Sequence, residues 1–333
     1  MAGNWPGFEG AFLHGSITWL PDDAILPETS DVDLIVVLSD DGLPPNPGKF
    51  RYDGVLLDAS ILPADQARSA EQILGISHLA GSLRGASILA DPTGHLSELH
   101  EIVARDFAKR EWVIRRCEHA RSKVLNFLDQ IEPSAPLHDN VMSWLFGTGC
   151  TTHVLLVAGL RNPTVRSRYI AVHDLLAEHG RLDIHEELLE LLGAANLSRK
   201  QVEQHFAAMT EAFDATKQVV RTPVFFASDM SDVARPIAID GTRDMIDRGY
   251  HREAMFWIAA TQTRCQTILT AEAPQELHDR FTPGYRAMLS DLGIVAYDNL
   301  SQRSEAVRSY LRSLWTTAET IMEAPPAPAD PQT

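Results

Sequence analysis

The chain has 333 residues, of which 44% are hydrophobic and 22% charged, and its formal net charge at pH 7 is −16. The length suggests about two domains, and the composition is typical of a globular protein. The acidic charge disfavours an extended basic groove for nucleic acid. The three cysteines are far apart and odd in number; they form no CxxC metal-binding pattern and favour a reducing compartment.

The N-terminal residues contain neither a basic segment nor a long apolar segment, so no signal peptide is predicted. No apolar run approaches the roughly 18 residues that a membrane-spanning helix needs. The sequence therefore predicts a cytoplasmic protein that does not enter a membrane.

The first part of the chain, up to about residue 92, has the pattern of strands separated by turns. Strands are predicted at 12–15, 33–38, 51–62 and 85–94, and a helix at 64–74. The run DLIVVL at 33–38 is continuously apolar and rich in β-branched residues, which is typical of a strand covered on both faces.

From about residue 93 the apolar residues recur at three- and four-residue steps, which predicts helices. The expected helical segments are 96–131 (two helices or one bent helix), 138–160, 163–179, 183–193, 198–221, 231–249, 251–272, 275–292 and 301–323. The predicted fold class is α+β, with a small mixed-sheet domain at 1–108, an all-helical domain at 109–323 and a disordered Pro/Ala-rich tail at 324–333.

Two aspartates, Asp31 and Asp33, lie at the start of the strand predicted at 33–38. Residues i and i+2 of a strand share a face, so the two carboxylates point the same way and repel each other. No arginine or lysine nearby in the sequence neutralises them, whereas a divalent cation would. Each residue taken alone has a plainer interpretation, because Asp31 and the preceding Ser30 are also typical of a turn or cap.

A third acid, Asp58, lies within the apolar stretch GVLLDASIL, where a lone buried carboxylate is costly. If its strand pairs with the strand at 33–38, Asp58 completes a cluster of three carboxylates, a set of hard oxygen ligands that suits Mg²⁺. The alternative is that Asp58 lies at a strand end or accepts hydrogen bonds from backbone N–H groups.

A glycine–serine turn, Gly15–Ser16, closes the first predicted strand. Glycine lets backbone N–H groups approach an anion closely, and the serine hydroxyl can donate to a phosphate oxygen. The dipeptide alone is common. Followed by an Asp–x–Asp motif at the start of a buried strand and by a later aspartate within a strand, it becomes a specific indication of a metal–nucleotide site.

These stretches, LHGS (13–16), SDVDLIVVL (30–38) and VLLDASI (55–61), resemble the polymerase-beta-type nucleotidyltransferase superfamily. The layout of a short α/β part followed by helices is similar to the antibiotic (aminoglycoside-modifying) nucleotidyltransferases. The resemblance covers about the first 100 residues and implies a nucleotidyltransferase domain there.

The resemblance implies that Asp31, Asp33 and Asp58 hold two Mg²⁺ ions. Asp58 would bind the catalytic metal, accept the proton of the attacking hydroxyl, or do both. Gly15 and Ser16 would cradle the phosphates of a nucleoside triphosphate (NTP), with Ser30 as a further nucleotide-binding candidate. The implied reaction moves a nucleoside monophosphate, AMP by expectation, from the NTP to a hydroxyl of a small molecule and releases pyrophosphate.

Two departures from the family pattern stand out. The gap between Ser16 and Asp31 is longer than usual, at fourteen residues, and the arginine that often follows the glycine–serine turn is absent. Arg166 and Arg168, near a predicted helix start, are the candidates to replace it at the phosphates. The competing interpretation is an ion-paired helix face in water.

Two alternative functions stay open at this point. The same chemistry can modify a protein or an RNA end, although the net charge disfavours RNA. A nucleotide-binding regulatory module without turnover is the other alternative, and the intact three acids argue against it. The sequence does not identify the acceptor or the oligomeric state.

Overall fold

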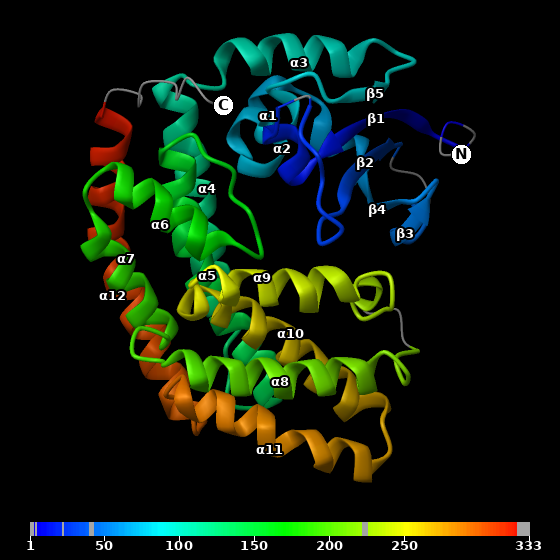
Figure 1. Ribbon diagram of the computed structural model, residues 1–333. Coiled ribbons are helices and arrows are strands. Elements are labelled where there is room, and N and C mark those ends of the chain that lie inside the picture. The colour runs from blue at the N-terminus through cyan, green and yellow to red at the C-terminus, as the bar shows by residue number, and fades with distance from the viewer. Residues whose placement is uncertain (1–2, 4, 22, 40–42, 222–225, 325–333) are drawn as a thin grey trace. The chain divides into compact units, whose positions relative to one another are not determined.

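The computed structural model describes the chain except residues 1–2, 4, 22, 40–42, 222–225 and 325–333. A five-stranded mixed sheet near the N-terminus is followed by a helical region, which confirms the α+β class (Figure 1). The predicted tail lies, from residue 325 onward, outside the described residues.

The chain forms two compact units, which differ from a simple division along the sequence. Unit 1 comprises residues 1–119, 156–164 and 318–333, and unit 2 comprises residues 120–155 and 165–317. Helices α4, α5 and α12 contribute residues to both units. The domain boundary predicted between residues 108 and 109 stays a prediction.

The sheet of unit 1 has the strand order β3-β4-β2-β1-β5. Strands β2 and β4 are parallel, and the other neighbouring pairs are antiparallel. The bounds are β1 (Phe8–His14), β2 (Val32–Leu38), β3 (Gly48–Tyr52), β4 (Val55–Pro63) and β5 (Ile88–Ala90). The apolar run predicted at 33–38 is confirmed as an inner strand, with Ile35 to Leu38 buried.

The single strand predicted at 51–62 is wrong, because a hairpin turn interrupts it. Asp53 and Gly54 both have positive φ, 49° and 82°, and Tyr52 pairs with Val55 across the turn. Two positive-φ residues in a two-residue loop define the turn that matches the twist of antiparallel strands, and Asp–Gly is its favoured sequence. Strand β3 is therefore an additional strand at the edge of the sheet.

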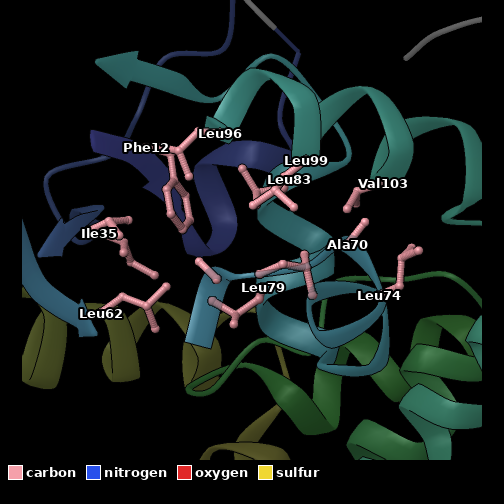
Figure 2. Packing of buried hydrophobic residues seen from close by; sticks show 13 residues of the cluster. Phe12, Ile35, Leu62, Ala70, Leu74, Leu79, Leu83, Leu96, Leu99 and Val103 are labelled. Atoms are coloured by element: carbon pink, nitrogen blue, oxygen red, sulfur yellow. The ribbon is translucent and has the colours of Figure 1, made fainter. Parts of the chain in front are cut away.

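Three helices cover one face of this sheet: α1 (Ala70–Gly75), α2 (Ser77–Leu83) and α3 (His95–Asp106). Figure 2 shows Phe12, Ile35 and Leu62 from the strands facing Leu79, Leu83 and Leu96 from the helices, in one buried cluster. Along β2, Asp33 shares the face of Ile35 because their side chains are two residues apart. The acids therefore lie on the helix-covered face, where β2 begins.

The remaining helices follow the predicted periodicity, and the segment predicted at 96–131 is two helices, α3 and α4. Their bounds are α4 (Arg110–Leu128), α5 (Leu137–Ala158), α6 (Arg168–Glu178), α7 (Leu182–Leu192), α8 (Arg199–Thr216), α9 (Gly241–Asp247), α10 (His251–Glu272), α11 (Gln275–Asp291) and α12 (Tyr297–Glu323). Short 3-10 helices are η2 (Gly15–Trp19), η3 (Ala64–Ala67) and η4 (Ala227–Asp229), and η5 (Pro236–Asp240) is a π-helix. The predicted helix at 231–249 is thus η5 followed by α9.

The apolar helices α5 and α10 supply much of the helical core. Helix α10 packs against α8, α9 and α11. Helix α5 is, within the described part of the chain, the one helix long and apolar enough to cross a membrane, contrary to the expectation that no such segment exists. Since 78% of its most apolar window is buried inside the structure, and core helices of soluble proteins meet the same criteria, we interpret it as a core helix.

Candidate active site

Four polar side chains lie in register across four neighbouring strands of the sheet. Lys49 of β3 pairs with Asp58 of β4, Asp58 pairs with Asp33 of β2, and Asp33 pairs with His14 of β1. Directly paired residues of neighbouring strands point to the same face of a sheet, so the four side chains form one row. The strand pairing required to bring Asp58 beside Asp33 is therefore present.

Asp31, the residue before β2, joins this row to complete the predicted set of three acids. Carboxylate oxygens of Asp31, Asp33 and Asp58 all lie within 4.8 Å of one another. The side chains of Asp31 and Asp58 are 18% and 24% exposed, so solvent reaches them from one side. An all-oxygen, anionic donor set of this size fits Mg²⁺, which binds through a few carboxylates and completes its shell with water and phosphate oxygens.

Lys49 supplies the positive charge that no arginine or lysine close to Asp31 and Asp33 in the sequence supplies. Its ammonium Nζ lies 2.8 Å from Oδ2 of Asp31 and also donates a hydrogen bond to Oδ2 of Asp58. The Lys49 side chain is only 8% exposed, which makes the pair of contacts more effective than a surface ion pair. The lysine was missed because it is distant from Asp31 in sequence and the hairpin that positions it was not predicted.

The signal for Lys49 was present in the Asp53–Gly54 dipeptide. Once that dipeptide is taken as a two-residue hairpin turn, counting outward pairs Tyr52 with Val55 and Lys49 with Asp58. His14 was also outside the predicted site. Its Nδ1 lies 2.7 Å from Oγ of Ser82 on α2, which ties the end of β1 to the covering helix.

Gly15 is placed where the chain leaves β1, directly beside the carboxylate of Asp33. Its φ of +70° is a left-handed conformation, and a Cβ atom added there would lie 1.9 Å from Oδ2 of Asp33. Both the backbone conformation and the close approach therefore require glycine. The turn continues into η2, where Oγ1 of Thr18 donates a hydrogen bond to the Gly15 carbonyl oxygen over 2.9 Å.

Substituting Gly15 by alanine is expected to lower the free energy of unfolding by about 3 kcal/mol, because a left-handed alanine is strained and its Cβ displaces the Asp33 carboxylate. Urea unfolding followed by circular dichroism measures this loss. Gly94→Ala is the matched control, since Gly94 also has a positive φ, of 78°, but open space around it. The control should lose only about 1 kcal/mol, and equal losses in the two variants would contradict the role of the Asp33 contact.

Ser16 and Ser30, the two serines predicted to bind the nucleotide, are next to Gly15 and Asp31 in the sequence. Ser16 is half-buried within η2, and Ser30 is half-buried just before Asp31, with its N–H donating to the Pro27 carbonyl oxygen over 2.9 Å. Trp19 ends η2 beneath the guanidinium of Arg84, whose Cζ lies 3.8 Å from the ring centroid. The long segment between Ser16 and Asp31 is thus anchored at its beginning by a stacked arginine.

Arg166 and Arg168 belong to unit 2 and are engaged in packing there. Arg168 is 1% exposed, donates through Nε to the Val165 carbonyl oxygen and stacks on Phe256, and burial lowers its pKa to about 10. Nη1 of Arg166 donates to the Ile237 carbonyl oxygen over 2.9 Å. These contacts favour structural roles for both arginines. The helix also begins later than expected, because α6 starts at Arg168 rather than at residue 163.

Comparisons with known proteins add no assignment. No protein-family model matches the chain, and no curated protein matches it in sequence.

Proposed function

We propose that the chain is a Mg²⁺-dependent nucleotidyltransferase of the polymerase-beta type, which transfers a nucleoside monophosphate from an NTP to a hydroxyl of a small molecule. The observation that carries the proposal is the convergence of Asp31, Asp33 and Asp58 beside the turn at Gly15. The order of these residues along the chain supports the same proposal. Gly15 follows β1, and the acids lie at the start of β2 and within the adjacent parallel strand β4.

Asp31, Asp33 and Asp58 would hold the metal, and the metal would neutralise phosphate charge and stabilise the entering and leaving oxygens of an in-line displacement. Gly15 would keep the turn close enough to the acids for its backbone to face the phosphates, with the Ser16 hydroxyl as a further donor. Asp58 would accept the proton of the attacking hydroxyl, provided that the acceptor lies within hydrogen-bond reach. We expect the acceptor to be a small polar molecule, and the acidic net charge favours one that is cationic.

The direct test is pyrophosphate release by the full chain with each of the four NTPs and Mg²⁺, against a panel of aminoglycosides, lincosamides and nucleosides. We expect release with at least one pair of NTP and acceptor, and its loss in EDTA. Labelled ATP that marks a protein band instead of a small molecule would redirect the proposal to protein nucleotidylation.

One observation favours a second candidate, a nucleotide-binding module without turnover. Lys49 contacts two of the three acids. A lysine that partly neutralises the acids would suit a site that binds a nucleotide without catalysing its transfer. Calorimetry that detects binding of an NTP with Mg²⁺, together with no pyrophosphate release across the whole panel, would select this candidate.

A further inference from the structure

The ammonium of Lys49 contacts two of the three carboxylates, those of Asp31 and Asp58, that would bind a metal ion. It contacts an Oδ2 atom of each acid, while oxygens of all three acids lie within 4.8 Å of one another. A divalent cation bound by this set would lie within a few ångströms of Nζ. Two positive charges at that separation repel strongly at a partly buried position.

The charges of the site explain why a lysine is stabilising there. Asp33 pairs with Asp58 across two strands, and Asp31 lies two residues before Asp33. When ionised, the three carboxylates carry three negative charges, and the ammonium of Lys49 offsets one of them. With its side chain 8% exposed, the ammonium is little screened by solvent. Because the lysine stem is flexible, Nζ can move away while the backbone of β3 stays in place.

We propose that Lys49 is an internal counter-cation that competes with the divalent metal for Asp31 and Asp58. Metal binding then requires displacement of the ammonium from both carboxylates, so Lys49 sets how tightly the site holds metal. This inference deepens the proposed function and depends on it for the existence of a metal site at the three acids.

The test measures Mn²⁺ binding to the full chain without nucleotide, by the electron paramagnetic resonance signal of free Mn²⁺. Lys49→Met removes the charge but keeps the length of the side chain, and we expect it to bind Mn²⁺ at least about tenfold more tightly than the unmodified chain. Lys49→Arg keeps the charge and can hold the carboxylates through two donors, so its affinity should be no higher than that of the unmodified chain.

Arg51→Met is the matched control for a general loss of positive charge. Arg51 lies on the same strand, is exposed and donates to the Gly54 carbonyl oxygen over 3.1 Å. We expect Arg51→Met to bind Mn²⁺ with nearly the affinity of the unmodified chain, because an exposed charge is screened. An equal gain in Arg51→Met and Lys49→Met would overturn the specific role of Lys49.

The remaining outcomes separate this inference from the proposed function. If the unmodified chain binds Mn²⁺ and Asp33→Asn does not, but Lys49→Met binds no more tightly, the inference is wrong and the proposed function stands. If none of the variants binds Mn²⁺, both are wrong. A Lys49→Met chain that folds only when Mn²⁺ is present supports the inference, since the metal has replaced the ammonium, and one that stays unfolded at saturating Mn²⁺ overturns it.

Discussion

Asp33→Asn is expected to lower the rate of nucleotidyl transfer by at least about a thousandfold while the chain stays folded. Asp33 lies on an inner strand between Asp58 and His14, and an amide oxygen there carries no negative charge to bind Mg²⁺. Since the substitution also removes one of three mutually repelling carboxylates, the free energy of unfolding should be unchanged or slightly higher.

Initial rates of pyrophosphate release and thermal unfolding of the same preparations measure the two effects. Asp53→Asn is the matched control, because Asp53 is exposed in the hairpin turn and asparagine tolerates its positive φ of 49°. The control should keep full activity. Activity close to that of the unmodified chain in Asp33→Asn would rule out the proposed mechanism.

Arg168→Ala is expected to lower the free energy of unfolding by about 3 kcal/mol. The guanidinium is buried, its Cζ lies 4.0 Å from the Phe256 ring centroid, and its Nε donates to the Val165 carbonyl oxygen over 2.7 Å. Truncation would leave a cavity between these groups and remove a hydrogen bond at the start of α6. Urea unfolding measures the loss.

Arg248→Ala provides the comparison, because Arg248 also lies over an aromatic ring, that of Tyr250, but at an exposed position. Its loss of stability should be within about 0.5 kcal/mol. If Arg168→Ala is as stable as the unmodified chain and instead binds NTP more weakly, the prediction of a phosphate contact at Arg168 would be supported and the packing role would be wrong.

The sequence predicted the fold well where a single pattern of apolar residues, that of a strand or that of a helix, covers a whole segment. The short apolar run at 33–38, rich in β-branched residues, is typical of a buried inner strand. The two acids at its start share a face because side chains of a strand alternate between faces. The helical periodicity after residue 93 predicted most of the helices within a few residues. The pairing of Asp58 with Asp33 depends on which strands are neighbours in the sheet. The sequence does not reveal the strand order, so the three-acid cluster could be predicted only on the assumption that these two strands pair.

The errors occurred where two patterns overlap. Tyr52 and Val55 flank Asp53–Gly54 within a stretch that is otherwise strand-like, and the continuous apolar pattern concealed the turn. Lys49 went unnoticed with it, because its contact with the acids passes across the hairpin. For Arg168, positive charge suggested a solvent-exposed face, whereas its long stem and planar guanidinium pack on an aromatic ring in the core.

The position of β3 at the edge of the sheet gives Lys49 a second effect. An edge strand has a strand neighbour on one side only, so its backbone hydrogen bonds open more readily than those of inner strands. The ion pairs of Lys49 link this edge strand to acids at the start of β2 and within β4. A divalent cation bound by those acids would displace the ammonium and remove this link, so the backbone hydrogen bonds of the hairpin would open more often even though β3 keeps its place in the sheet.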